Sequence, residues 1–88
     1  MSFQCIVVTP EQQAVDQTII QAIVPGHDGL RGILTNRAPM LMKLGSGPLR
    51  LDLTDGQQLH FVIDGGVAQM KDNTLTILTN MAKPERAR

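Results

Sequence analysis

The stretch L-R-L-D-L-T-D-G-Q-Q-L-H-F-V-I-D, residues 49–64, contains two runs in which large apolar side chains occupy every second position. The apolar positions of the two runs are Leu49, Leu51 and Leu53, then Leu59, Phe61 and Ile63. A period of two places alternate side chains on opposite faces of a strand. The pattern therefore predicts two strands, each with one buried face, that are joined as a hairpin.

The same alternation predicts how the two strands of this hairpin pair. Residues directly opposite each other share a face of the sheet, so apolar positions must meet apolar positions. The predicted partners are Leu53 with Leu59, Leu51 with Phe61, and Leu49 with Ile63. Such pairing needs an odd number of loop residues around Asp55-Gly56-Gln57, so we expect a three- or five-residue loop with a bulge.

A second hairpin follows between residues 67 and 78. If Met70 lies opposite Leu75, Asp72-Asn73 becomes a two-residue loop, and both residue types tolerate left-handed backbone angles. Ahead of this hairpin, Gly65-Gly66 predicts a bend or a close backbone approach.

The remaining strand signals are short runs rich in β-branched and apolar residues. They cover Ser2–Thr9, Ala14–Val24 and Met40–Leu44. Pro10, Pro25-Gly26 and the break Gly45-Ser46-Gly47-Pro48 end these runs. About eight short strands without a helical period predict an all-β fold, an antiparallel β-sandwich or flattened barrel. The charged tail 82–88 contains Pro84, and we expect it to be flexible and to hold no packed element.

Composition narrows the classes of function. With 88 residues, 42% hydrophobic and 18% charged, the chain is expected to form one globular domain over 1–88. Its 8 basic and 8 acidic residues cancel, so nothing indicates binding to nucleic acid or to an anionic membrane. No apolar run approaches the roughly 20 residues that span a bilayer, so direct membrane insertion is not expected.

Residue types that could carry chemistry are present but scattered. Ser46 lies in a Gly-Pro turn without a G-x-S-x-G motif. Neither the pair His27-Asp28 nor the pair His60 and Asp64 has a third metal ligand at strand spacing. Cys5 occupies an alternating strand position and is expected to be a buried apolar residue. The sequence predicts no catalytic residue, no metal site and no cofactor.

The segment V-P-G-H-D-G-L-R-G-I-L-T-N-R-A-P-M-L, residues 24–41, differs from the rest of the chain. Its glycines and prolines predict repeated turns, yet it also carries many apolar side chains. Solvated loops are rarely so apolar, so we expect the segment to pack on the body or on a partner. Arg31 and Arg37 beside apolar residues indicate a protein interface, and two solvated loop charges are the alternative.

This segment resembles a motif of the epsilon subunit of rotary ATP synthases, G-x-x-G-x-x-G-[ILV]-L-P-x-H-A-P-[LM]-[LVM]. The matching residues are Gly26, Gly29, Gly32, Ile33, Leu34, Ala38, Pro39, Met40 and Leu41. Residues 7–13, V-V-T-P-E-Q-Q, resemble the family's V-V-[ST]-x-E, and Asp64–Val67 resembles its [ST]-G-G-[FIV]. Thr35 and Arg37 replace the usual Pro and His, and Leu30 stands where an acidic residue is common.

The resemblance implies the N-terminal β-sandwich domain of that subunit, without the C-terminal helical hairpin. It implies a non-catalytic rotor subunit in the central stalk of a proton-translocating ATP synthase, on the cytoplasmic face of the bacterial inner membrane. Such a subunit couples the gamma subunit to the membrane c-ring. By position, the expected c-ring contacts are Leu30, Arg31, Gly32, Asn36 and Arg37. The expected gamma contacts are Thr9, Glu11, Ala38, Pro39 and Met40.

Two other classes of function remain open from the residues alone. A stand-alone β-sandwich that binds a ligand or a protein would have a pocket of several hundred Å³ with converging polar groups. A small hydrolase would need a histidine within hydrogen-bond reach of a nucleophile. An apolar face made for a partner would also allow the isolated chain to self-associate.

Overall fold

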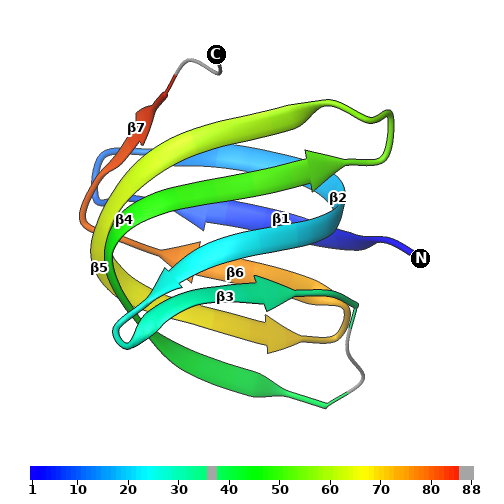
Figure 1. The fold of residues 1–88 in the computed structure, drawn as a ribbon, viewed down its shortest axis with the longest axis horizontal. Coiled ribbons are helices and arrows are strands. Elements are labelled where there is room, and N and C mark those ends of the chain that lie inside the picture. Colours follow the sequence, from blue (N-terminus) through cyan, green and yellow to red (C-terminus); the bar gives the residue numbers. More distant parts are fainter. Residues whose placement is uncertain (36–37, 86–88) are drawn as a thin grey trace.

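The structure is a computed structural model that describes residues 1–35 and 38–85 (Figure 1). These residues form seven strands and no helix. The strands are β1 (Phe3–Val8), β2 (Gln13–Gly26), β3 (Gly29–Ile33), β4 (Met40–Leu53), β5 (Gln58–Lys71), β6 (Thr74–Leu78) and β7 (Ala82–Pro84).

The sheet closes on itself. Hydrogen-bonded neighbours run in the order β1-β6-β5-β4-β2, and β1 pairs with β2 as well as with β6. β3 extends the sheet beyond β2, and β7 pairs with β5. The predicted all-β sandwich or flattened barrel is confirmed. One pair departs from a purely antiparallel sheet, because β1 and β6 close the barrel in parallel.

β4 and β5 each cross from one layer to the other. The predicted strand break at Gly45–Pro48 is wrong, because β4 runs 14 residues through these positions. The bend or close backbone approach predicted at Gly65-Gly66 is confirmed, and it lies inside β5, which is also 14 residues long. Figure 1 shows both as long ribbons that curve back on themselves. At the bend Gly65 and Gly66 have φ of 66° and 113°, and the Ser46 hydroxyl donates to Asp64 Oδ1 at 2.5 Å. The described residues form seven strands, where about eight were predicted.

The register of the β4–β5 hairpin differs from the prediction by two residues. Leu49 lies opposite Phe61, and Leu51 lies opposite Leu59. The Leu53 N–H donates to the Gln57 carbonyl at 2.8 Å, which leaves the three loop residues 54–56. The predicted faces and the shorter predicted loop are confirmed, but the predicted partners are wrong.

The β5–β6 hairpin matches its prediction. Met70 lies opposite Leu75, and Lys71 lies opposite Thr74. Asp72 and Asn73 form the two-residue loop with φ of 53° and 58°. Two positive φ angles are those of a type I′ turn, whose twist matches that of the flanking strands.

The core is filled by the inward-facing side chains of β1, β2, β4, β5 and β6. Its completely buried members include Phe3, Cys5, Val7, Ile19, Leu49, Leu51, Ile63, Leu75 and Ile77. Cys5 is buried as predicted, and this burial, with a smaller contribution from Asp16, raises the pKa of its thiol from 9.0 to about 12.

The prediction that the tail 82–88 holds no packed element is wrong, because Ala82–Pro84 form β7. β7 pairs with residues 61–63 of β5, and the Glu85 N–H donates to the His60 carbonyl at 2.8 Å. Pro84 is compatible with this position because β7 has β5 as its only partner among the described residues.

Candidate partner-binding surface

The glycine- and proline-rich segment forms a hairpin where repeated turns were predicted. β2 continues to Gly26, His27-Asp28 makes the turn, and β3 returns from Gly29. A Cβ atom on Gly26 would lie only 2.8 Å from the Gly29 carbonyl oxygen. Glycine at position 26 therefore lets the two strands approach at the turn.

β3 lies at an edge of the sheet and exposes apolar side chains. Among the described residues it pairs only with β2. Leu30 on the strand is 63% exposed and Leu34 just after it is 60% exposed, whereas Ile33 between them is buried. Large apolar side chains at an open edge are typical of a surface that another protein covers.

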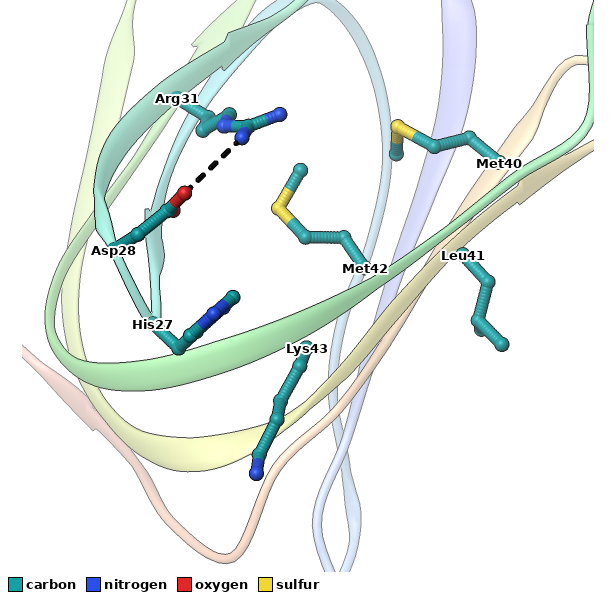
Figure 2. A pocket seen from close by; sticks show the side chains of 7 residues that line it. All are labelled: His27, Asp28, Arg31, Met40, Leu41, Met42 and Lys43. Carbon is teal, nitrogen blue, oxygen red and sulfur yellow. Dashed lines mark hydrogen bonds and ion pairs between the residues drawn. The ribbon is translucent and has the colours of Figure 1, made fainter.

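A recess of about 240 Å³ lies between this hairpin and the start of β4 (Figure 2). It is lined by His27, Asp28, Arg31, Met40, Leu41, Met42 and Lys43. Figure 2 shows the side chains of Met40 and Met42 pointing toward Arg31, while those of Leu41 and Lys43 leave β4 on its other face. Flexible thioether side chains fit irregular apolar surfaces, which suits the recess to a partner's side chain.

The charged groups of the recess are accessible to solvent. Arg31 Nη2 lies 3.3 Å from Asp28 Oδ2, and each side chain is more than half exposed. An ion pair this exposed contributes little to folding. Both groups are therefore available to a partner.

Residues 1–35 and 38–85 contain no group of three histidine, cysteine or acidic side chains that could hold a metal ion. Neither His27 nor His60 is hydrogen-bonded through its side chain to a serine or a cysteine of this part of the chain. The raised pKa of Cys5 belongs to a core position, outside the recess. No helix in the same residues is long and apolar enough to cross a membrane.

A second surface, apolar at three of its four positions, crosses four strands on the outer face of the sheet. Direct strand pairing aligns Lys43 with Val67, Val67 with Leu78, and Leu78 with Val8. We call these four residues the outer row. Leu78 is 51% exposed. The row links the recess beside β3 to the β1–β2 turn, and sequence reasoning missed it.

The β1–β2 turn directly follows Val8, the last residue of the outer row. The Thr9 N–H donates to the Gln12 carbonyl at 2.8 Å, and Glu11 is exposed between them. A shallow recess of about 380 Å³ lies beside this turn. It is lined by Val8, Thr9, Pro10, Gly66, Val67, Leu78, Thr79 and Asn80.

The structure brings together some of the residues predicted as contacts and separates others. Leu30, Arg31 and Gly32 lie side by side on exposed β3, and Arg31 shares the recess with Met40. Ala38 and Pro39 are exposed immediately before β4, whereas Thr9 and Glu11 lie at the other end of the outer row. Asn36 and Arg37 lie outside the described residues. The contacts themselves remain predictions.

Comparison with known proteins identifies the family of this chain. The family model described as "ATP synthase, Delta/Epsilon chain, beta-sandwich domain" matches residues 2–85. An ATP synthase epsilon chain from Rhodopirellula baltica is 43% identical over 84 residues, which are 96% of this chain and 65% of that relative. A chloroplastic epsilon chain from Emiliania huxleyi is 40% identical over 83 residues, 94% of this chain and 63% of its own length.

Solved structures agree in fold. A chain of the mitochondrial ATP synthase of Euglena gracilis superimposes with a TM-score of 0.86 at 20% identity, over 94% of this chain and 53% of that chain. A chain in the central stalk and c-ring structure of the Tetrahymena thermophila mitochondrial ATP synthase superimposes with a TM-score of 0.72 at 20% identity, over 90% of this chain and 63% of that chain. Because the family model covers nearly the whole sequence, the chain belongs to the β-sandwich domain family of ATP synthase delta and epsilon chains.

Proposed function

We propose that this chain is a non-catalytic rotor subunit of an ATP synthase, which couples the gamma subunit to the c-ring. It acts as a rigid adaptor: one surface binds gamma and another meets the ring, so the two turn together. In this role it is peripheral to the membrane, on the cytoplasmic face of a bacterial inner membrane, and needs no cofactor or active site of its own.

The observation that carries the proposal is a row of residues with a recess at each end. Lys43 lines the recess beside β3 together with Met40 and Met42, whereas Val8, Val67 and Leu78 line the recess beside the β1–β2 turn together with Thr9. Exposed Leu30 lies on β3 at the first end of the row. Family membership supports the assignment of its two ends. We assign β3 with Leu30, Arg31 and Gly32 to the c-ring, and the outer row with Thr9 and Glu11 to gamma. Ala38, Pro39 and Met40 join the gamma surface.

Binding to gamma tests this function directly. The chain is mixed with a bacterial catalytic head and gamma that lack their own epsilon, and the mixture is separated by size exclusion. We expect the chain to migrate with the complex. A head assembled without gamma is the control, and it should leave the chain in the low-mass fractions.

A matched pair of variants tests which surface binds. Leu78→Ser alters a member of the outer row that is 51% exposed, and Ile20→Ser alters an apolar side chain of β2 that is 43% exposed and lies in neither recess nor the outer row. We expect Leu78→Ser to weaken comigration more than Ile20→Ser. Absence of any gamma-dependent comigration of the unchanged chain would contradict the rotor function and would leave a ligand- or protein-binding sandwich as the explanation.

A further inference from the structure

Three segments that are distant in sequence meet at the side chain of Asn73. The Asn73 Nδ2 group donates to the Ser2 carbonyl at 3.0 Å. The Thr35 hydroxyl lies 3.2 Å from Asn73 Oδ1 and 3.4 Å from the same Ser2 carbonyl. We call these three residues the clasp. It joins the start of the chain, the β5–β6 turn and the connection that follows β3.

The hydrogen-bonding chemistry of the clasp fixes the orientation of the Asn73 amide. A backbone carbonyl only accepts, so the amide must turn its NH₂ group to Ser2. Its oxygen then faces the Thr35 hydroxyl, which has one proton to donate. An asparagine satisfies both partners at once, whereas an aspartate could accept from Thr35 but could not donate to Ser2.

The turn itself does not need the Asn73 side chain. Asn73 has φ of 58°, a left-handed angle that glycine adopts readily. Its carbonyl accepts from the Gln4 N–H at 3.1 Å, a backbone bond that any residue at position 73 can make. Asp-Gly is a preferred sequence for a type I′ turn. The turn conformation alone thus accounts for either asparagine or glycine at position 73. The side-chain hydrogen bonds to Ser2 and Thr35 are not needed to form the turn.

The clasp holds the backbone next to an exposed apolar side chain. Leu34 directly precedes Thr35 and is 60% exposed, and Ile33 before it is anchored in the core. Further along, Met40 pairs with Met70, which lies two residues before the Asp72-Asn73 turn of the same β5–β6 hairpin. That hairpin therefore restrains the β3–β4 connection at two points.

We propose that Asn73 is a positioning residue: through Thr35 it fixes the backbone that presents Leu34 to the gamma subunit, the partner also proposed for Ala38, Pro39 and Met40 on the same connection. Its effect on affinity rests on the proposed function, while its effect on the free chain does not. The hydroxyl of Thr35 supplies a restraint at the position where the sequence motif quoted above has proline, whose ring restrains φ covalently.

Four variants test the clasp. Asn73→Gly removes both amide bonds and keeps the turn, and Thr35→Val removes the hydroxyl while keeping the β-branched shape. Thr35→Ser keeps the hydroxyl and is the control, and Leu34→Ala removes the side chain that the clasp presents. Amide exchange of Leu34 and Thr35 in the free chain is measured by NMR, beside the Tm and the affinity for the head–gamma complex.

We expect Asn73→Gly and Thr35→Val each to speed exchange at Thr35 by about 2- to 10-fold and to weaken binding by a similar factor, without lowering the Tm in step. Thr35→Ser should stay within about twofold of the unchanged chain on both readouts. In a Leu34→Ala background, Asn73→Gly should weaken binding little further, because the two residues act through one contact.

Unchanged exchange in both clasp variants overturns the proposal, as does an additive loss of affinity in the Leu34→Ala background. If the unchanged chain does not bind the head–gamma complex, the proposed function fails separately. The exchange rates of the free chain then decide whether the clasp restrains Thr35.

Discussion

Gly66 on β5 lies directly against the Leu78 carbonyl of β6: a Cβ atom at Gly66 would be 1.9 Å from that oxygen. Its φ of 113° is also one that other residues rarely adopt. The bend that carries β5 between the two layers therefore depends on the absence of a side chain at this position. Leu78 belongs to the outer row, so the same contact supports the proposed partner surface.

Gly66→Ala should be strongly destabilising, because the chain must shift backbone atoms and strain φ together. We expect a loss of about 3–5 kcal/mol in the free energy of unfolding, or failure to fold. Gly65→Ala is the control: its φ of 66° suits the left-handed region, and its Cβ would meet nothing closer than Asn80 Nδ2 at 3.7 Å. Urea unfolding should give it a loss near 1 kcal/mol. Equal losses would refute the steric explanation.

Leu49→Ala should destabilise the core. Leu49 lies on β4, and its side chain is completely buried. Truncation of a buried leucine lowers the free energy of unfolding by about 2–5 kcal/mol. For a domain of this size each kcal/mol lowers the Tm by about 4–8 °C. Leu41→Ala, at a mostly exposed position, should change stability by less than about 0.5 kcal/mol. Calorimetry of both variants checks the assignment of inner and outer faces along β4, which a similar Tm for both would contradict.

The buried thiol of Cys5 makes stability depend on alkaline pH. Burial raises its pKa from 9.0 to about 12 in the folded chain, so the native state keeps a proton that the unfolded state releases. Stability is therefore complete below pH 9 and falls as the pH rises from 9 towards 12, by up to about 1.4 kcal/mol per pH unit. Urea titrations of the unchanged chain and of Cys5→Ala should show a steeper alkaline loss in the former. An equal alkaline loss of stability in the two chains would mean that folding does not raise the pKa of the Cys5 thiol.

Arg31→Glu should affect partner binding more than folding. Arg31 pairs only with exposed Asp28 among the described residues, so reversal of its charge should change the free energy of unfolding by about 0.5 kcal/mol or less. At a protein interface the same reversal costs more, because it places a like or unpaired charge against the partner. Binding to a detergent-solubilised c-ring and thermal unfolding are measured side by side, with Lys71→Glu as a control at another exposed position. A loss of Tm that accounts for the loss of binding would rule out a contact role.

The alternation in residues 49–64 predicted which side chains face the core, because a period of two leaves only two choices. It did not determine the partners, since a shift of two residues preserves the same faces. The three-residue loop settles the register: Gly56 has a φ of 89°, and Asp55 Oδ1 accepts from the Gln57 N–H at 3.0 Å. Such turn chemistry could not be distinguished from a five-residue loop by periodicity.

The candidate surface was only partly predictable for a related reason. Leu30 and Arg31 are close in sequence, so their composition alone indicated an interface. Val8, Val67 and Leu78 are far apart in sequence, and only the pairing of β1, β5 and β6 aligns them. A signal was available in the β5–β6 hairpin, where Val67 and Leu78 occupy outward positions that are usually polar.

Restoration of ion pumping tests the central claim most directly. Membrane vesicles that contain the c-ring and the rest of an ATP synthase, stripped of their own epsilon, hydrolyse ATP while acidification of the lumen is followed by a fluorescent dye. A coupling adaptor should restore ATP-driven pumping when this chain is added, and Arg31→Glu should restore less. ATP hydrolysis that continues without pumping, although the chain is bound to gamma, would contradict the proposal that it joins gamma to the ring.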